Sequence, residues 1–406
     1  MPRSERLLGR RVSGGAVLNK EDRRSEKREA RDVGLQPLSP LPDQTQRWVD
    51  FGQDPIPFEE GYRRVMEHHE EDGARQDIPI NGLRSWWFVA LGSLMGMRKI
   101  PLPGRGNDVV VPLRRLAWQQ LCGKIDAPAD YLSRMPSKVQ LSCVNWDLSK
   151  QSKDALLRTA RGEGRALLSS RYAAIDDAMY LDVVNDVLHA AGYRNDALVR
   201  VVASGPHTVL RVTIPNDAKA IKRNDPIEYG IDIGNSELGM RSVQITPVTY
   251  RLVCLNGMRS WRSEATRRMR HVGDVGRLRE TLEDAVPVAI AEAKGDFDLW
   301  HKATERLIDD AFAEIESLQS FGFSKPEREA VGRQLAADND LDGRNLAEML
   351  KHTSTSVYDV ANAITASAKG RGVKETDDDR DGVSVRVESR LRFEELGSDY
   401  LRRRAA

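Results

Sequence analysis

The sequence predicts an α+β protein, in which antiparallel β-hairpins with inserted helices are followed by a helical C-terminal region. Two hairpins carry this prediction. The stretch ALVRVVASGPHTVLRVTIP has two runs of strand-forming residues around a turn at residues 204–206, and residues 227–258 supply a second pair of strands. Residues 280–369 instead show helical spacing. No regular alternation of strand and helix occurs, so a doubly wound sheet is not expected.

The chain divides into five predicted segments. They are a disordered charged and Pro-rich arm (1–46), an N-terminal helical segment (47–110), an α+β core (111–279), a helical region (280–370) and a charged linker and tail (371–406). The arm interleaves Arg and Lys with acidic residues in EDRRSEKREARD, a composition that cannot bury enough apolar surface to order itself. It is interpreted either as a solvated tail or as an accessory nucleic-acid arm.

Composition excludes several classes of protein. The 62 Lys and Arg nearly balance the 61 Asp and Glu, so any argument about nucleic acid depends on local blocks of charge. Cys122, Cys143 and Cys254 are few and far apart, which predicts neither a disulfide framework nor a zinc site and fits a reduced, cytoplasmic setting. No apolar run approaches the ~20 residues of a membrane span. The charged N-terminus predicts no secretory signal.

The first elements are expected within residues 47–170. FEEGYRRVMEHHEED predicts a helix with an exposed polar face, on which His68 and His69 point about 100° apart and make a poor metal pair. SWWFVALGSLMGM is an apolar segment for core burial. NDVVVP predicts a strand, LRRLAWQQLCGKI and APADYLSRMP predict helices, and KVQLSCVNWDL predicts a strand. SKDALLRTARG predicts a helix capped by Ser152 and ended by Gly162.

The later core elements surround the second hairpin. RALLSSRYAAI predicts a strand, and DDAMYLDVVNDVLHAAG predicts a helix with Asp176 as its cap and Gly192 as its end. Asn235 and Ser236 are expected to form the turn of the hairpin. After Asn256-Gly257, the stretch SWRSEATRRMRHVG predicts a strongly basic helix. The last part of the tail is expected to be a short helix or a strand.

No motif for catalysis or cofactor binding is recognisable. The chain has no phosphate-binding G-x-x-x-x-G-K-[ST] loop, no G-x-G-x-x-G after a strand and no H-E-x-x-H, so neither a cofactor nor a metal is predicted. Asp377 and Asp378 stand in a linker-like acidic run, which is typical of a solvated stretch and, as an alternative, of a Mg²⁺ site. Cys254 is interpreted as a buried thiol. An enzyme would need Cys254 or Asp232 to meet a histidine.

Positive charge beside β-structure is the remaining functional signal. Phosphate neutralisation needs Arg and Lys along one track, and Tyr250 and Trp261 supply aromatic rings among them. A plain solvated helix is the alternative interpretation. The basic residues predicted to contact nucleic acid are Arg171, Arg211, Lys222, Arg223, Arg241, Arg251, Arg259, Arg262, Arg267, Arg268 and Arg270.

Three blocks of the sequence resemble a family of phage- and plasmid-borne proteins that carry a domain of unknown function. The blocks are YGIDIGNSELG…ITPVTYRLVCLNGM, GEGRALLSSRYAAIDD and SVYDVANAIT. The resemblance implies a role in DNA replication, recombination or counter-defence. The mixture of hairpins and helices is also similar to single-strand annealing recombinases of the RecT and Erf types, which implies assembly into a homo-oligomer. The low aromatic content, 6%, favours backbone contacts over base stacking.

These observations lead to a leading hypothesis and a rival. The leading hypothesis is a mobile-element protein without enzymatic activity that binds or anneals single-stranded DNA, with the hairpin and the basic helix lining a groove. The rival is a protein-interaction or counter-defence factor without nucleic-acid contact, in which the basic helix docks on acidic helices such as ERLIDDAFAEIE.

Overall fold

The chain forms two compact units in the computed structural model. The N-terminal unit comprises Met1–Leu41 and Gly82–Lys153, and the sheet unit comprises Pro42–Asn81 and Asp154–Ala406. This division differs from the predicted segments, because residues 42–81 join the sheet unit and the predicted boundary at 110/111 falls inside the N-terminal unit. The residues described are 36–51, 54–100, 109–193, 196–215, 219–222, 224–252, 256–259, 266–273, 275–341, 345–368 and 387–405.

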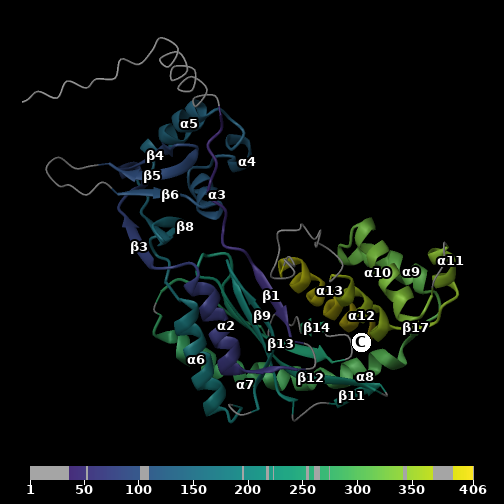
Figure 1. The fold of residues 1–406 in the computed structure, drawn as a ribbon. Helices are drawn as coiled ribbons and strands as arrows, with labels where there is room; N and C mark the ends of the chain where they lie inside the picture. Colours follow the sequence, from purple (N-terminus) through teal and green to yellow (C-terminus); the bar gives the residue numbers. More distant parts are fainter. Residues whose placement is uncertain are drawn as a thin grey trace, which may run out of the picture. The chain divides into compact units, whose positions relative to one another are not determined.

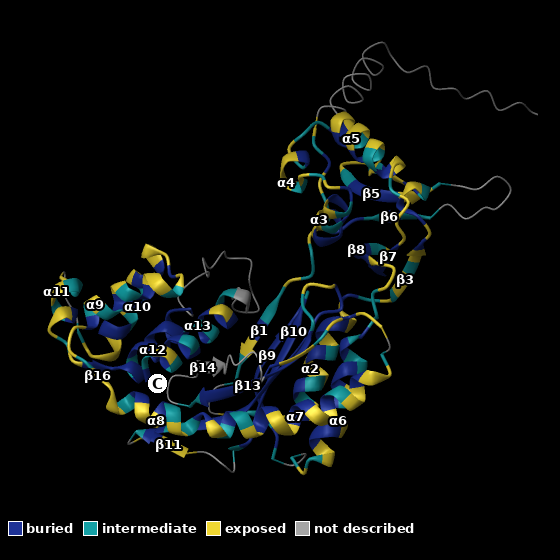
Figure 2. Ribbon diagram, turned by 180° about the vertical axis from the view of Figure 1, so that it is seen from behind, coloured by how far each residue is buried: buried dark blue, intermediate teal, exposed yellow. Residues whose placement is uncertain are grey.

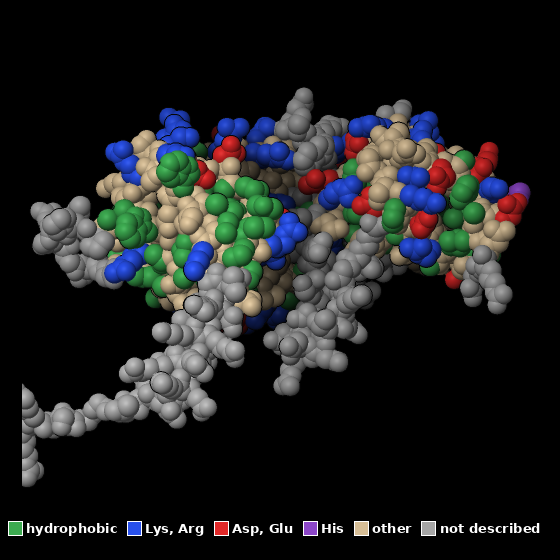
Figure 3. Space-filling model, turned by 90° about the horizontal axis from the view of Figure 1, so that it is seen from above, with side chains coloured by type: hydrophobic (Ala, Val, Ile, Leu, Met, Phe, Trp, Pro, Cys, Tyr) green, Lys and Arg blue, Asp and Glu red, His purple; other side chains and the backbone are tan. Residues whose placement is uncertain are grey.

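The N-terminal unit packs a small antiparallel sheet against short helices. The strand order is β4-β5-β6. The ring of Phe88 on the inner face stacks on Trp118 with centroids 5.2 Å apart, beside the buried Met95 and Met97. Figure 3 shows hydrophobic side chains between Lys and Arg on one face of this unit, at the left. Its elements are η1 (Leu83–Ser85), β4 (Trp86–Leu91), β5 (Leu94–Lys99), β6 (Val110–Pro112), α3 (Arg115–Lys124), α4 (Ala129–Leu132) and α5 (Ser137–Ser149).

A nine-stranded antiparallel sheet is the centre of the sheet unit (Figure 1). The main order is β1-β9-β10-β12-β13-β14, with β15 also on β13, β11 on β12 and β2 on β9. The two predicted hairpins are β9–β10 and β12–β13. The strands are β1 (Arg47–Asp50), β2 (Ile56–Pro57), β9 (Leu198–Ser204), β10 (Thr208–Thr213), β11 (Lys219–Lys222), β12 (Asp225–Asn235), β13 (Val243–Arg251), β14 (Asn256–Arg259) and β15 (Arg267–Met269).

Helices cover both faces of this sheet, and its central strands β9, β10, β12 and β13 are almost wholly buried (Figure 2). On one face, α2 (Phe58–Glu70), α6 (Asp177–Ala190) and α7 (Arg277–Gly295) pack on a core that includes Val199, Leu210, Ile231 and Ile245. The other face carries charged side chains, and α13 (Val387–Ala405) lies against it through Leu391 and Glu394. The last part of the tail, which was expected to be either a short helix or a strand, is therefore the helix α13.

The remaining helices follow the sheet in the chain, as predicted for residues 280–369. They form a lobe with α13 around a core that includes Trp300, Tyr358 and Phe393. The α12 helix begins with a capping box, in which Ser356 and Asp359 satisfy each other's backbone amides. The elements are α8 (Phe297–Glu305), β16 (Leu307–Ile308), α9 (Ala311–Ser317), η3 (Leu318–Phe321), α10 (Lys325–Asp338), α11 (Leu346–Lys351), β17 (Thr355–Ser356) and α12 (Val357–Ser367).

Two element types predicted from the sequence are wrong. The predicted strand KVQLSCVNWDL is the helix α5, whose buried residues Gln140, Val144 and Leu148 are spaced by four. The predicted helix SKDALLRTARG is the strand β7 (Ala155–Ala160), which pairs with β3 (Arg75–Ile80) and β8 (Glu163–Ser169). Arg161 and Gly162 both have positive φ, which suits a tight hairpin turn rather than a helix end.

The predicted basic helix after Asn256-Gly257 is also wrong where the structure describes it. Residues 256–259 form β14 and residues 267–269 form β15, and both strands pair with β13. Buried backbone N–H and C=O groups need hydrogen-bond partners. Along one edge of β13, β14 supplies these partners for one stretch of the strand and β15 for another. Ser260 to Ala265, including Arg262 and Trp261, lie outside the described residues.

The charged face of the sheet generates a prediction about stability. Arg211 is 1% exposed, and its guanidinium donates to Asp232 (2.8 Å) and Glu394 (2.6 Å). The change Arg211→Met would remove the cation that these two buried carboxylates share and leave Glu394 only the more distant Arg390 (3.5 Å), so we expect unfolding to become easier by roughly 3–5 kcal/mol in urea titrations. The matched change Arg279→Met removes an exposed pair with Asp186 and should cost less than about 1 kcal/mol. Equal losses in the two variants would contradict this account.

Candidate functional site

A buried carboxylate, that of Glu237, joins three separate parts of the sheet unit. Arg75 Nη1 lies 2.6 and 2.7 Å from its two oxygens, and Arg165 Nη2 donates to Oε2 at 3.2 Å. The backbone N–H of Asp177 donates to Oε1 at 3.0 Å. Arg75 begins β3, Arg165 lies on β8 and Asp177 begins α6. Glu237, two residues after the end of the hairpin strand β12, therefore holds the start of a helix and two strands of another sheet.

Asp177 is the second buried carboxylate of this region. His69 Nε2 lies 2.6 Å from Oδ2, which also accepts from Thr208 Oγ1 at 2.8 Å, and Asn235 Nδ2 donates to Oδ1 at 2.7 Å. Burial opposes ionisation of Asp177, but His69 and the two hydrogen bonds outweigh it and lower its pKa to about 2. Asp177 is thus an anion at neutral pH.

Further contacts close the group into one network. Arg165 Nε lies 2.9 Å from Asp72 Oδ2, and Arg75 Nη2 lies 2.6 Å from His69 Nδ1. Three carboxylates therefore face two guanidinium groups and one imidazole. We call this network the Glu237 cluster, and its members are His69, Asp72, Arg75, Arg165, Asp177, Asn235 and Glu237.

Three members of the Glu237 cluster are residue types that can bind a metal ion. Ligand atoms of His69, Asp177 and Glu237 lie within 4.8 Å of one another. Each of these atoms already contacts a donor within the cluster, and a cation there would face the guanidinium groups of Arg75 and Arg165. A divalent ion would have to displace both arginines, so the arrangement favours a set of buried ion pairs.

Three segments of chain meet next to the Glu237 cluster, around Ser236. Tyr172 donates its hydroxyl proton to Ser236 O at 2.8 Å and stacks on His271 with ring centroids 4.8 Å apart. Ala173 N–H donates to His271 O at 2.9 Å, and Tyr172 and Val272 form a backbone bridge. The loop after β8, the turn between β12 and β13, and the segment after β15 are therefore held together.

These three segments carry five of the predicted basic residues. Residues 168–175, 238–250 and 266–273 contain no Asp or Glu, and they carry five arginines between them. Arg171 follows β8, Arg241 lies in the hairpin turn, and the others lie on or beside β15. Arg241 is partly exposed and the other four are exposed. We call this set the arginine surface, and it comprises Arg171, Arg241, Arg267, Arg268 and Arg270.

The other predicted basic residues are not part of this surface. Arg211 is in the core, Lys222 Nζ lies 2.8 Å from Asp359, and Arg251 donates to Asp225 at 2.6 Å. Arg211 and Lys222 join the sheet to α13 and α12, and Arg251 joins β13 to β12. Arg259 lies on β14, and its side chain is outside the described part of the structure. Arg223, Arg262, Cys254, Asp377 and Asp378 also lie outside the described residues.

Sequence reasoning missed most of the Glu237 cluster. His68 and His69 were expected on an exposed helix face, but both are buried, and His68 Nδ1 contacts Ser204 Oγ at 2.5 Å. Asp176 occupies the N-cap position of α6, as predicted, but its carboxylate accepts from Arg158, and Glu237 bonds the first amide of the helix instead. The missed signal was the carboxylate within GNSELG, since an acid in an apolar hairpin needs buried partners.

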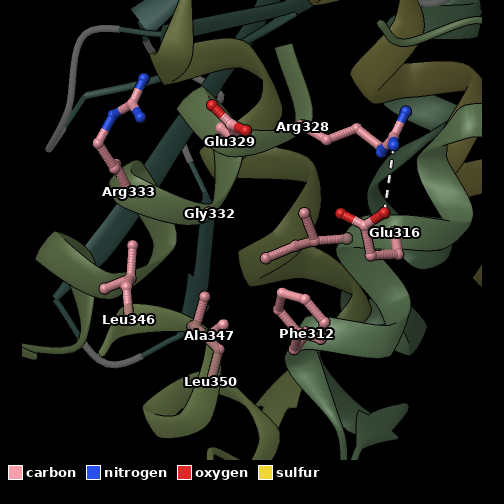
Figure 4. Close-up of a pocket in the computed structure, with 10 residues that line it drawn as sticks. Phe312, Glu316, Arg328, Glu329, Gly332, Arg333, Leu346, Ala347 and Leu350 are labelled. Carbon is pink, nitrogen blue, oxygen red and sulfur yellow. Dashed lines mark hydrogen bonds and ion pairs between the residues drawn. The ribbon is translucent and has the colours of Figure 1, made fainter. Parts of the chain in front are cut away.

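A separate cavity lies in the helical lobe between α9, α10 and α11. Its volume is about 170 Å³, and Phe312, Ile315, Leu346 and Leu350 line it (Figure 4). Arg328 donates to Glu316 at 3.1 Å beside it. This volume is below the ~300–1,000 Å³ of common small-molecule sites, and its lining brings no nucleophile and base together.

Among the described residues, no helix is long and apolar enough to cross a membrane.

Comparison with protein families gives one match. Residues 166–386, more than half of the chain, match the family described as a domain of unknown function, DUF932. Comparisons with curated proteins and with solved structures find no match. The matched region contains Asp177, Asn235 and Glu237 of the Glu237 cluster, while His69, Asp72, Arg75 and Arg165 lie before it.

The Glu237 cluster predicts coupled losses of stability and local order. In Glu237→Gln, an amide faces the partly buried Arg75 and the buried Arg165, so each guanidinium group loses one counter-charge and unfolding should become easier by about 3 kcal/mol. Trypsin should also cleave after Arg171 and Arg241 faster than in the parent protein, because the segments they lie in are no longer held. Glu67→Gln, on the exposed face of α2, is the matched control. Unchanged cleavage in Glu237→Gln would contradict the assigned role.

His68 predicts a pH dependence. Burial, with nearby Arg47 and His69, lowers its pKa to about 4, against about 6.5 in an unfolded chain. Between these values only the unfolded state takes up the proton, so this contribution to stability is present above pH 6.5 and is lost as the pH falls toward 4. His68→Gln should therefore flatten the decrease in urea midpoint between pH 6.5 and 4.5. The control variant His352→Gln changes an exposed histidine and should show the same decrease in urea midpoint as the parent protein. Parallel plots of urea midpoint against pH for the parent protein and both variants would exclude His68 as the cause.

Proposed function

The chain belongs to the DUF932 family, and we propose that it binds single-stranded DNA through the arginine surface. The observation that supports the proposal is the convergence of three chain segments that are free of acidic residues and carry five arginines. Hydrogen bonds from Tyr172 and Ala173 hold these segments together at one end of the sheet. Clustered guanidinium groups on a rigid support are the chemistry that neutralises successive phosphates.

The arginine surface favours contacts to the phosphate backbone. Its aromatic side chains, Tyr172 and His271, stack on each other in parallel, with an angle of 4° between the rings. Burial raises the pKa of Tyr172 and lowers that of His271, so neither ring brings a charge near neutral pH. The surface thus offers guanidinium groups and few open ring faces. Binding there should depend on phosphate spacing and hardly on base sequence.

The wider role follows from the same proposal. A protein that holds single strands by their phosphates leaves the bases open for pairing, which is the requirement for annealing complementary strands. This suits replication or recombination of phage and plasmid DNA, and the resemblance to annealing recombinases suggests a homo-oligomer on the strand.

The first test is a binding titration across a salt series. We expect a labelled 30-nucleotide single strand to bind at 50 mM salt and to lose affinity linearly in a double-logarithmic plot as salt rises. The triple change Arg267→Ala, Arg268→Ala, Arg270→Ala should weaken binding at least about tenfold and reduce the slope, because about three phosphate contacts are lost.

The control carries the same loss of charge elsewhere. Lys325→Ala, Arg333→Ala, Lys351→Ala removes three exposed cations from α10 and α11 and should bind like the parent protein. Thermal unfolding of both triple variants establishes that they are folded. An equal loss of DNA affinity in the two triple variants would mean that the effect comes from the overall charge of the protein and not from the arginine surface. Absence of binding by the parent protein at low salt would overturn the proposal and favour a protein-interaction role.

A further inference from the structure

Positive charge is concentrated in the N-terminal unit. Residues 82–153 contain eleven Lys and Arg against four Asp and no Glu, a net charge of +7, whereas the whole chain has +1. The rest of the chain is therefore acidic on balance. A polyanion would be attracted to the N-terminal unit before any other large part of the molecule.

Two tryptophans are exposed on this basic unit. Trp87 is 58% exposed and Trp146 is 66% exposed, whereas the four other described tryptophans are buried: Trp48, Trp86, Trp118 and Trp300. Single exposed apolar side chains are ordinary, whereas several gathered in one region mark an interaction site. The exposed rings stand on different elements, Trp87 on β4 and Trp146 on α5.

One contact brings the two tryptophans into the same region. Asn145 on α5 accepts from Phe88 N at 2.7 Å and donates to Phe88 O at 2.8 Å, so α5 is fastened to the edge of β4. Trp87 precedes Phe88 and Trp146 follows Asn145 in the chain. Phe88 is buried, so Trp87, its neighbour on the strand, faces the opposite side of the sheet.

A cation accompanies each exposed ring. Lys150 Nζ lies 4.2 Å from the centroid of Trp146, and Arg98 stands directly opposite Trp87 in the β4–β5 register. Figure 3 looks down on the end of the unit that carries α5, where hydrophobic side chains are bordered by Lys and Arg. We call Trp87, Arg98, Trp146 and Lys150 the tryptophan surface.

We propose that the tryptophan surface binds the bases of single-stranded nucleic acid by stacking. Indole rings take any base on their open face, and adjacent Lys or Arg reaches the neighbouring phosphate. A protein partner would be expected at an apolar patch poor in lysine, whereas here Lys150 lies on the exposed ring and residues 82–153 carry +7. The inference deepens the proposed function by adding a base-dependent site to the phosphate-dependent arginine surface.

The test separates bases from phosphates. Intact protein is titrated with a 30-nucleotide oligo-dT and with a sugar-phosphate strand of equal length that lacks bases. We expect the parent protein to bind oligo-dT about tenfold tighter and to lose tryptophan fluorescence on binding, since each stacked base contributes roughly a factor of five or more. Trp87→Ala, Trp146→Ala should abolish this preference and most of the quenching, with little change in the salt slope.

Controls distinguish stacking from misfolding and from a protein interface. Trp146→Phe keeps a ring and should retain most of the base preference, while Leu307→Ala removes an exposed apolar side chain of the sheet unit and should have no effect. Salt-dependent binding without base preference in the parent protein would overturn this inference and leave the arginine surface standing. Base preference that survives in the arginine triple variant with its salt slope unchanged would overturn the proposed function alone. A changed oligomeric state of the double tryptophan variant, with unaltered DNA binding, would assign the surface to a protein contact and overturn the inference.

Discussion

The ion pairs around Glu237 are the constraint on which the arrangement of the sheet unit depends. Removing a carboxylate from water costs several kcal/mol, and that cost is offset only when every oxygen finds a donor. Glu237 meets this requirement with two arginines and the first amide of α6. The partners come from distant parts of the chain, so the carboxylate specifies how β3, β8 and α6 lie against the β12–β13 hairpin.

The hairpin turn owes its shape to the same cluster. Asn235 and Glu237 point into the protein and bond Asp177 and the arginines, and Ser236 O accepts the Tyr172 hydroxyl between them. Arg241 lies a few residues further along the turn, and Tyr172 connects it to Arg171 and the segment after β15. The buried charges thus determine where the exposed arginines stand. A surface made of three separate loops gains the rigidity that phosphate binding needs.

Local patterns in the sequence predicted the fold class, both hairpins and the long helices, because each of these elements expresses one periodicity over many residues. The local patterns gave the wrong element type where contacts with residues distant in the sequence determine the structure. The stretch containing Ala155 to Ala160 has a modest helical propensity, but two neighbouring strands pair with it on both edges. The helix α5 was mistaken for a strand because Val139, Leu141 and Cys143 alternate, although Val139 and Cys143 face solvent. His69 and Glu237 are 168 residues apart, and no local pattern could join them. The arginines of the surface were named individually from the sequence, whereas their convergence depends on bridges such as Tyr172 to Val272.

A second buried network orders the C-terminal helix, and it acts on the opposite side of the hairpin strands. Arg211 bonds Asp232 on the neighbouring strand and Glu394 on α13, while Arg390 one turn earlier bonds Asp50 on β1. An apolar helix could slide along an apolar sheet at little cost, but a shift of α13 by one turn would separate these pairs inside the core. Charges therefore give α13 a single register, and strand β12 supplies polar side chains on both faces: the charged Asp232 toward α13 and, at its end, the amide of Asn235 toward the Glu237 cluster. The same strand thus coordinates the helix that closes the sheet and the loops that form the arginine surface. This explains in physical terms why its polar residues interrupt an otherwise apolar strand.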